Sequence, residues 1–146
     1  ETDDDRVESL RAIVDLHDRY GHIQEVILQN FRAKPRTRMA THPEPETYDT
    51  ARTIAVLRLM RPELNLQAPP NLNPFDHRLL LAAGINDWGG VSPVTPDHVN
   101  PESPWPELKQ LEKESAAAGF ALTERLTIYP QFIEQRCSCF SCSSGQ

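Results

Sequence analysis

The chain has 146 residues, of which 38% are hydrophobic, and its formal net charge at pH 7 is −6. A nucleic-acid partner is disfavoured, because phosphate binding needs clustered Lys and Arg side chains. No stretch approaches the ~20 apolar residues of a membrane span and no segment has a signal-peptide pattern, so we expect a globular cytoplasmic domain without a membrane partner.

The first segment predicts a helix followed by a buried strand. Thr2 is a capping residue, and the acidic run 3–5 faces the positive end of the helix dipole. Apolar residues then recur on one helical face until Gly21, a residue that readily takes the left-handed conformation ending many helices. Residues 23–28 are predicted to form a buried strand.

The next two units repeat a helix followed by a strand. Apolar spacing predicts a helix over about 48–57. A short strand at 64–68 follows, and the two prolines after it must leave the sheet because they cannot donate to a ladder. A third helix at about 75–83 precedes a strand candidate at 85–88.

The last unit has an amphipathic helix carrying Leu108, Leu111 and Ala118, which Gly119 ends, and then a strand candidate at 120–128. Alternating helices and strands predict an α/β fold with parallel strands. Four such pairs make half of a (β/α)₈ barrel, which needs about 250 residues.

Three polar stretches each follow a predicted strand. They are the first rim loop, Gln-Asn-Phe-Arg-Ala-Lys-Pro at 29–35; the second, Gln-Ala-Pro-Pro-Asn at 67–71; and the third, Asn-Asp-Trp-Gly-Gly-Val-Ser-Pro at 86–93. Barrels of this kind place their chemistry in the loops at the carboxyl ends of their strands. The rim loops are therefore the candidate functional segments.

Together with Tyr-Gly-His-Ile-Gln-Glu-Val-Ile at 20–27 and Thr-Pro-Asp-His-Val-Asn-Pro at 95–101, the rim loops resemble the radical S-adenosylmethionine enzymes that make the deazaflavin FO, in particular the ring-closing subunit or domain. The resemblance covers the later half of that family's catalytic domain. It implies that residues 1–132 form the C-terminal half of a radical S-adenosylmethionine (β/α) barrel of TIM type, with parallel strands and outer helices. Residues 133–146 would be an irregular Ser/Cys-rich tail.

The resemblance implies a lyase that forms 7,8-didemethyl-8-hydroxy-5-deazariboflavin (FO) from a pyrimidine adduct carrying ribityl and hydroxybenzyl groups, closing a ring with loss of ammonia. The implied cofactors are a [4Fe–4S] cluster and S-adenosylmethionine. The family's CxxxCxxC cluster motif is not in this sequence, so we expect the cluster ligands outside this chain and no activity from the chain alone. The companion FO synthase subunit, or a fused domain, is an expected partner.

The rim loops offer candidate substrate-binding side chains. Amides present a donor and an acceptor together, which matches the edges of a uracil-like ring or ribityl hydroxyls. A lysine could polarise a substrate carbonyl and a tryptophan could stack on a ring, although solvation, loop capping and core packing are the ordinary roles of such residues. The expected substrate-binding residues are Gln29, Asn30, Lys34, Gln67, Asn71 and Trp88.

The expected cofactor-binding residues are Glu1 and Arg32, and the expected catalytic residues are Asp87 and His98. The resemblance places Glu1, as the glutamate of a Gly-x-x-Glu motif, near S-adenosylmethionine, and Arg32 could neutralise the methionine carboxylate. Asp87 lies at a strand end, where burial could raise its pKa enough for proton transfer. His98 is a second catalytic candidate because histidine titrates near neutral pH. The alternative is that Asp97 caps a turn and His98 packs there.

Three cysteines, Cys137, Cys139 and Cys142, suggest a metal site. Their CxCxxC spacing differs from the family's motif, and three thiolates leave a zinc site incomplete. The histidines show no ligand spacing either, so we predict no metal site within this chain.

Two other functions remain open. One is a sister radical enzyme, such as the FO synthase activity that joins tyrosine-derived and pyrimidine fragments, or a menaquinone-pathway homologue. The first rim loop favours the ring-closing type over both. The other is a non-catalytic fragment that folds poorly or binds a partner through exposed strand edges.

Overall fold

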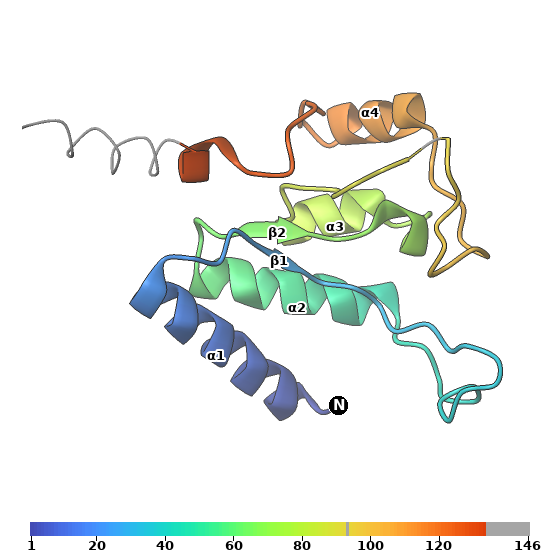
Figure 1. The fold of residues 1–146 in the computed structure, drawn as a ribbon, viewed down its shortest axis with the longest axis horizontal. Coiled ribbons are helices and arrows are strands. Elements are labelled where there is room, and N and C mark those ends of the chain that lie inside the picture. Colours follow the sequence, from blue (N-terminus) through green and yellow to red (C-terminus); the bar gives the residue numbers. More distant parts are fainter. Residues whose placement is uncertain (93, 134–146) are drawn as a thin grey trace, which may run out of the picture.

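The structure is a computed structural model, and it describes residues 1–92 and 94–133. Helices alternate with two short strands along this part of the chain (Figure 1), which confirms the predicted α/β class. Every helix in it is too short or too polar to cross a bilayer. The elements are α1 (Asp3–Tyr20), β1 (Glu25–Ile27), α2 (Thr47–Met60), β2 (Asn65–Gln67), the 3₁₀ turn η1 (Pro70–Leu72), α3 (His77–Ala83) and α4 (Leu108–Ala117).

Helix α1 begins and ends where its sequence predicts. The Thr2 hydroxyl accepts a hydrogen bond from the Asp5 N–H at 3.2 Å, and the Asp5 carboxylate accepts one from the Thr2 N–H at 2.7 Å. This reciprocal capping box satisfies donors that a helix start otherwise leaves without partners. Gly21 ends the helix at a φ of 61°, in the left-handed region where glycine has no Cβ clash.

Strands β1 and β2 form a parallel pair, joined by the helical crossover that parallel strands need. Val26 lies opposite Leu66, and Ile27 opposite Gln67. A single parallel bridge joins Gln67 to Asp87. The strand predicted at 85–88 is therefore reduced to one bridge.

The strand predicted at 120–128 is wrong, because this segment pairs with neither β1 nor β2. The Gln24 side chain holds its backbone instead. Gln24 Nε2 donates to the Thr127 carbonyl at 3.1 Å, and Gln24 Oε1 accepts from the Tyr129 N–H at 3.0 Å. One side-chain amide thus satisfies backbone groups that a neighbouring strand would otherwise pair.

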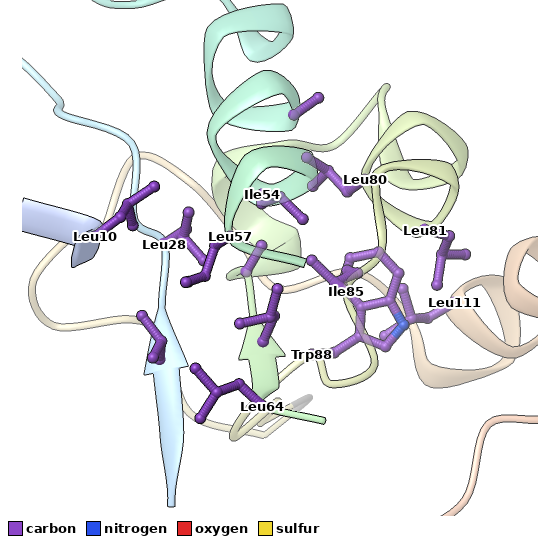
Figure 2. Packing of buried hydrophobic residues seen from close by; sticks show 14 residues of the cluster. Leu10, Leu28, Ile54, Leu57, Leu64, Leu80, Leu81, Ile85, Trp88 and Leu111 are labelled. Carbon is purple, nitrogen blue, oxygen red and sulfur yellow. The ribbon is translucent and has the colours of Figure 1, made fainter. Parts of the chain in front are cut away.

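Side chains alternate between the two faces of the sheet, and one face holds the core (Figure 2). Two strand residues, Val26 and Leu66, and three that flank the strands, Leu28, Leu64 and Ala68, lie on this core face. The helices cover them with Leu10, Ile54, Leu57, Leu80 and Leu111. The opposite face carries Glu25, Ile27, Gln67 and Asp87, and we call it the non-core face. Its polar residues are available to meet other parts of the chain or a ligand.

Leu57 and Leu59 on α2 give a matched test of this packing, since Leu57 is 0% exposed and Leu59 is 82% exposed. We expect Leu57→Ala to lower the free energy of unfolding by about 2–5 kcal/mol, because it removes apolar contacts and leaves a cavity. Leu59→Ala should change it by less than about 0.5 kcal/mol. Urea unfolding followed by circular dichroism measures both. Equal losses would mean that α2 packs by a different face.

Candidate functional site

Asn30 and Asn73 join the loops that follow β1 and β2. Asn30 Nδ2 donates to Asn73 Oδ1 at 2.7 Å, and Asn73 Nδ2 donates to Asn30 Oδ1 at 3.1 Å. Asn73 Nδ2 also donates to the Pro69 carbonyl at 3.0 Å. Both side chains are buried. Asn30 therefore has a loop-joining role beside its predicted ligand role, and nothing in the sequence sets Asn73 apart from other loop asparagines.

The two cations of the first rim loop are paired with carboxylates. Arg32 donates to Glu44 at 2.6 Å and also to the Leu72 carbonyl, and Glu44 accepts a further bond from the Ala33 N–H at 2.9 Å. These bonds, that from Arg32 first, lower the pKa of Glu44. Lys34 pairs with Glu102. Both predicted ligand-binding cations thus have protein partners.

Asn71 faces Asp97 across the second rim loop. Its Nδ2 donates to Asp97 Oδ2 at 2.9 Å and to the Ser103 carbonyl at 3.1 Å. Asp97 Oδ1 caps the turn that follows it, accepting from the backbone N–H groups of Val99 and Asn100 at 2.8 and 3.0 Å. Desolvation acts to raise the pKa of Asp97, but its hydrogen bonds outweigh this and lower it to about 2. His98 is exposed, so it does not pack in this turn.

The predicted ligand-binding residues of the first and second rim loops line two separate cavities. The first, of about 610 Å³, lies between the end of β1 and the start of α2 and is lined in part by Glu1, Gln29 and Asn30. The second, of about 690 Å³, is lined in part by Arg32, Lys34, Asn71 and Glu102. The expected cofactor-binding pair, Glu1 and Arg32, is therefore split between the cavities. Glu44 lines both.

The third rim loop turns back at Gly89 against the side chain of Gln67. Gly89 has a φ of +74°, and a Cβ placed there would lie 2.1 Å from Gln67 Nε2. Asp87 Oδ1 accepts a hydrogen bond from the Gly89 N–H at 2.6 Å, which fixes the turn. Gln67 and Asp87, predicted in different rim loops, thus lie together on the non-core face.

Asp87 is held by two residues from a distant part of the chain. The Tyr129 hydroxyl donates to Asp87 Oδ2 at 2.6 Å, and Arg125 Nε donates to the same oxygen. Burial acts to raise the pKa of Asp87, but the bonds from Arg125, Tyr129 and Gly89 outweigh it and the pKa is lowered. This is the opposite of the raised pKa expected from the strand-end position. Sequence reasoning missed Arg125 and Tyr129, although their spacing of four places them on one side of an extended segment.

Trp88 packs in the core beside Leu111 (Figure 2) and is 7% exposed, so it is not open to stacking on a ligand. Its ring centroid lies 5.0 Å from that of His77. The two ring nitrogens of buried His77 meet the Glu114 carboxylate and, at 3.0 Å, the Pro70 carbonyl. Burial acts to raise the pKa of Glu114, but its bonds to His77 and Gln110 outweigh this and lower it. His77 thus ties the second rim loop to α4.

Residues 1–92 and 94–133 bring together no group of three His, Cys, Asp or Glu side chains that could hold a metal ion. The cysteines Cys137, Cys139 and Cys142 lie outside the residues that the structure describes. An iron–sulfur cluster, which is held mainly by cysteine thiolates, would need ligands from outside the described part of the chain.

Known proteins share much of this sequence. A 7,8-didemethyl-8-hydroxy-5-deazariboflavin synthase of Methanopyrus kandleri is 53% identical over 135 residues, which are 92% of this chain and 40% of that protein. The synthase of the same name from Methanothermobacter thermautotrophicus is 47% identical over 135 residues, 92% of this chain and 41% of that protein. An FO synthase of Mycobacterium tuberculosis is 51% identical over 136 residues, 92% of this chain and 16% of that protein.

These identities confirm the resemblance that the rim loops predicted. The chain is homologous to one part of proteins named FO synthase, and it spans between 16% and 41% of the length of these relatives. No family model matches the chain, and no solved structure matches it.

Gly89→Ala should disturb the contact between the third rim loop and Gln67. The positive φ alone costs an alanine about 1–2 kcal/mol, and the new Cβ would push the Gln67 amide aside. Gly90→Ala is the matched control, because a Cβ there meets nothing within 4 Å. Thermal unfolding and the NMR signals of the Gln67 side-chain amide measure both variants. An unmoved Gln67 signal in Gly89→Ala would contradict the close packing.

Asp97 should make its turn sensitive to acid. Because its folded pKa of about 2 lies below the ordinary value of 3.8, the stabilisation is complete above pH about 4 and is lost as pH falls toward 2. The backbone N–H signals of Val99 and Asn100, followed by NMR from pH 5 to 2, should shift in that lower window. Asp97→Asn should abolish the shift. A midpoint at or above 3.8 would show that the bonds to Asp97 do not favour its ionised form.

Proposed function

We propose that this chain supplies the later half of the catalytic barrel of an FO synthase, which closes a ring with loss of ammonia in a pyrimidine adduct carrying ribityl and hydroxybenzyl groups. The observation that carries the proposal is 53% identity over 92% of the chain to a protein bearing that name. The parallel β1–β2 pair, with helices packed on its core face, supports a (β/α) barrel of TIM type for residues 1–132. Residues 133–146 are proposed as a tail outside it.

The proposed reaction is a radical lyase reaction. S-adenosylmethionine and a reduced [4Fe–4S] cluster would supply the radical chemistry when bound. The described residues do not fit the cluster, since no metal-holding group is found among them. Because the CxCxxC spacing of Cys137, Cys139 and Cys142 also differs from the family's CxxxCxxC motif, we assign its ligands to another part of a longer polypeptide or to another chain.

We assign S-adenosylmethionine to the first cavity. Its volume of about 610 Å³ lies in the range of small-molecule sites. Glu1 brings a carboxylate that can accept from an amine or ribose hydroxyl, and Gln29 brings both a donor and an acceptor. Arg32 reaches this cavity only through its partner Glu44.

The non-core face and the rim loops are proposed to hold the pyrimidine adduct. A radical reaction needs a rigidly held substrate and no competing hydrogen donors. The Asn30–Asn73 pair fixes two rim loops to each other. Gln67 is half-buried against Gly89, so its amide can bind the substrate from a fixed position. Lys34 and Asn71 line the second cavity.

Asp87 is proposed as the acid–base residue in preference to His98. Asp87 lies on the non-core face next to Gln67, whereas His98 is exposed on a loop. An ionised carboxylate can accept a proton, or a hydrogen bond, from a substrate N–H or a departing amine. A sister radical enzyme is not favoured, because the relatives are named as FO synthases.

A hybrid protein tests the proposal. The 135 matched residues of the Methanopyrus kandleri synthase are replaced by those of this chain, and the hybrid is reconstituted anaerobically with iron and sulfide. With S-adenosylmethionine and the pyrimidine adduct, we expect FO fluorescence and release of 5′-deoxyadenosine. Tyrosine in place of the adduct should give no product, whereas a coupling enzyme would use it.

The matched control carries the corresponding segment of the Methanothermobacter thermautotrophicus synthase, which is 47% identical to this chain. An active control beside an inactive hybrid would reject the proposal. The isolated chain, assayed in parallel, should give neither product. The fused or companion partner is tested by adding the remainder of the Methanopyrus kandleri protein as a separate chain, which should restore activity if the two parts associate.

A further inference from the structure

The segment after α4 crosses the non-core face of the sheet. In Figure 1 it runs above the strands, on the side opposite α1 and α2. Gln24 binds the backbone of Thr127 and Tyr129 at 3.1 and 3.0 Å, so the segment is fixed to the residue just before β1. Tyr129 is buried. The sequence predicted a strand here and gave these residues no function.

Arg125 and Tyr129 lie against each other and against two carboxylates. The Arg125 guanidinium carbon is 4.1 Å from the centroid of the Tyr129 ring. Arg125 also lies 3.3 Å from the Glu25 carboxylate and donates to Asp87 through Nε. The guanidinium therefore neutralises charge from both ends of the non-core face, and the tyrosine ring fixes its plane.

The hydrogen bonds that Asp87 already accepts leave its carboxylate with few free acceptor positions. An ionised carboxylate has about four acceptor positions, two on each oxygen. Arg125 and Tyr129 occupy Oδ2, and the Gly89 N–H occupies one position on Oδ1. One acceptor position on Oδ1 is left, on the oxygen that faces the Gly89 turn.

We propose that Arg125 and Tyr129 are positioning residues, which hold the Asp87 carboxylate so that Oδ1 both fixes the Gly89 turn against Gln67 and accepts one N–H or O–H donor of the ligand. The inference deepens the proposed function and rests on it for its kinetic readout. Its structural readout, the state of the Gly89 amide, is independent of any activity.

Two conservative variants test the proposal. Tyr129→Phe removes one oxygen and keeps the buried ring, and Arg125→Lys keeps the charge but not the Nε–H. In this chain, each should weaken the protection of the Gly89 amide, measured by hydrogen exchange, by about tenfold or more. In the hybrid synthase, each should lower kcat about tenfold or more with KM changed less than threefold, since a misplaced group can cost about 100-fold. The acid limb of the pH profile should move to higher pH, because Asp87 loses a donor that favours its ionised form.

Tyr48→Phe and Arg78→Lys are the matched controls, since both residues are exposed on helices. They should leave the Gly89 amide and the kinetics unchanged. Unchanged Gly89 protection in Tyr129→Phe and Arg125→Lys would overturn the inference. A hybrid without these substitutions that has no activity would reject the proposed function. The Gly89 measurement would still decide the inference about Arg125 and Tyr129. If the variants lose kcat but the acid limb of the pH profile does not shift, the two residues have only a structural role, and the inference is overturned.

Discussion

Side chains alternate across the two faces of the β1–β2 pair, and a slip of one residue in either strand would exchange those faces. With Val26 opposite Leu66, the apolar residues meet α2, and Gln67 falls on the non-core face. The bridge from Gln67 then carries Asp87 to the same face. The positions of the second and third rim loops therefore depend on the burial of leucine and valine side chains on the opposite face.

Long-range polar contacts fix the positions of the rim loops, which the packing of the core does not determine. Loops have no repeating hydrogen-bond pattern, so each rim loop needs its own partners. The first is joined to the second by Asn30 and Asn73, because Asn73 also binds the Pro69 carbonyl of the second loop. The second is tied to α4 by His77, and the third is held through Asp87. Each of these is a buried or half-buried polar group, which costs about 1–3 kcal/mol if left without a partner. Their energetic importance comes from that penalty more than from the strength of any one bond.

Features set by neighbouring residues could be predicted from the sequence, and features set by distant residues could not. The ends of α1 follow from Thr2, Asp5 and Gly21, which act within a single turn. The segment at 120–128 has apolar residues typical of a strand, yet its partner is Gln24, about 100 positions away. The pKa of Asp87 was misjudged for the same reason: burial was foreseeable from its place at a strand end, but Arg125 and Tyr129 were not. Composition predicts the rim loops as candidate functional segments, whereas the division of their residues between two cavities is visible only in the fold.

The contacts also indicate which parts of the rim can rearrange when a ligand binds. The Arg32–Glu44 pair is partly exposed, with side-chain exposures of 27% and 38%, and such pairs contribute about 0–1 kcal/mol. A ligand carboxylate can displace Glu44 at small cost, because it replaces one ion pair with another. The buried Asn30–Asn73 pair offers no such exchange, since parting it would leave two amides without partners. We therefore expect any rearrangement of the rim to begin at the Arg32–Glu44 pair, while the amide pair stays fixed and keeps the two loops in register.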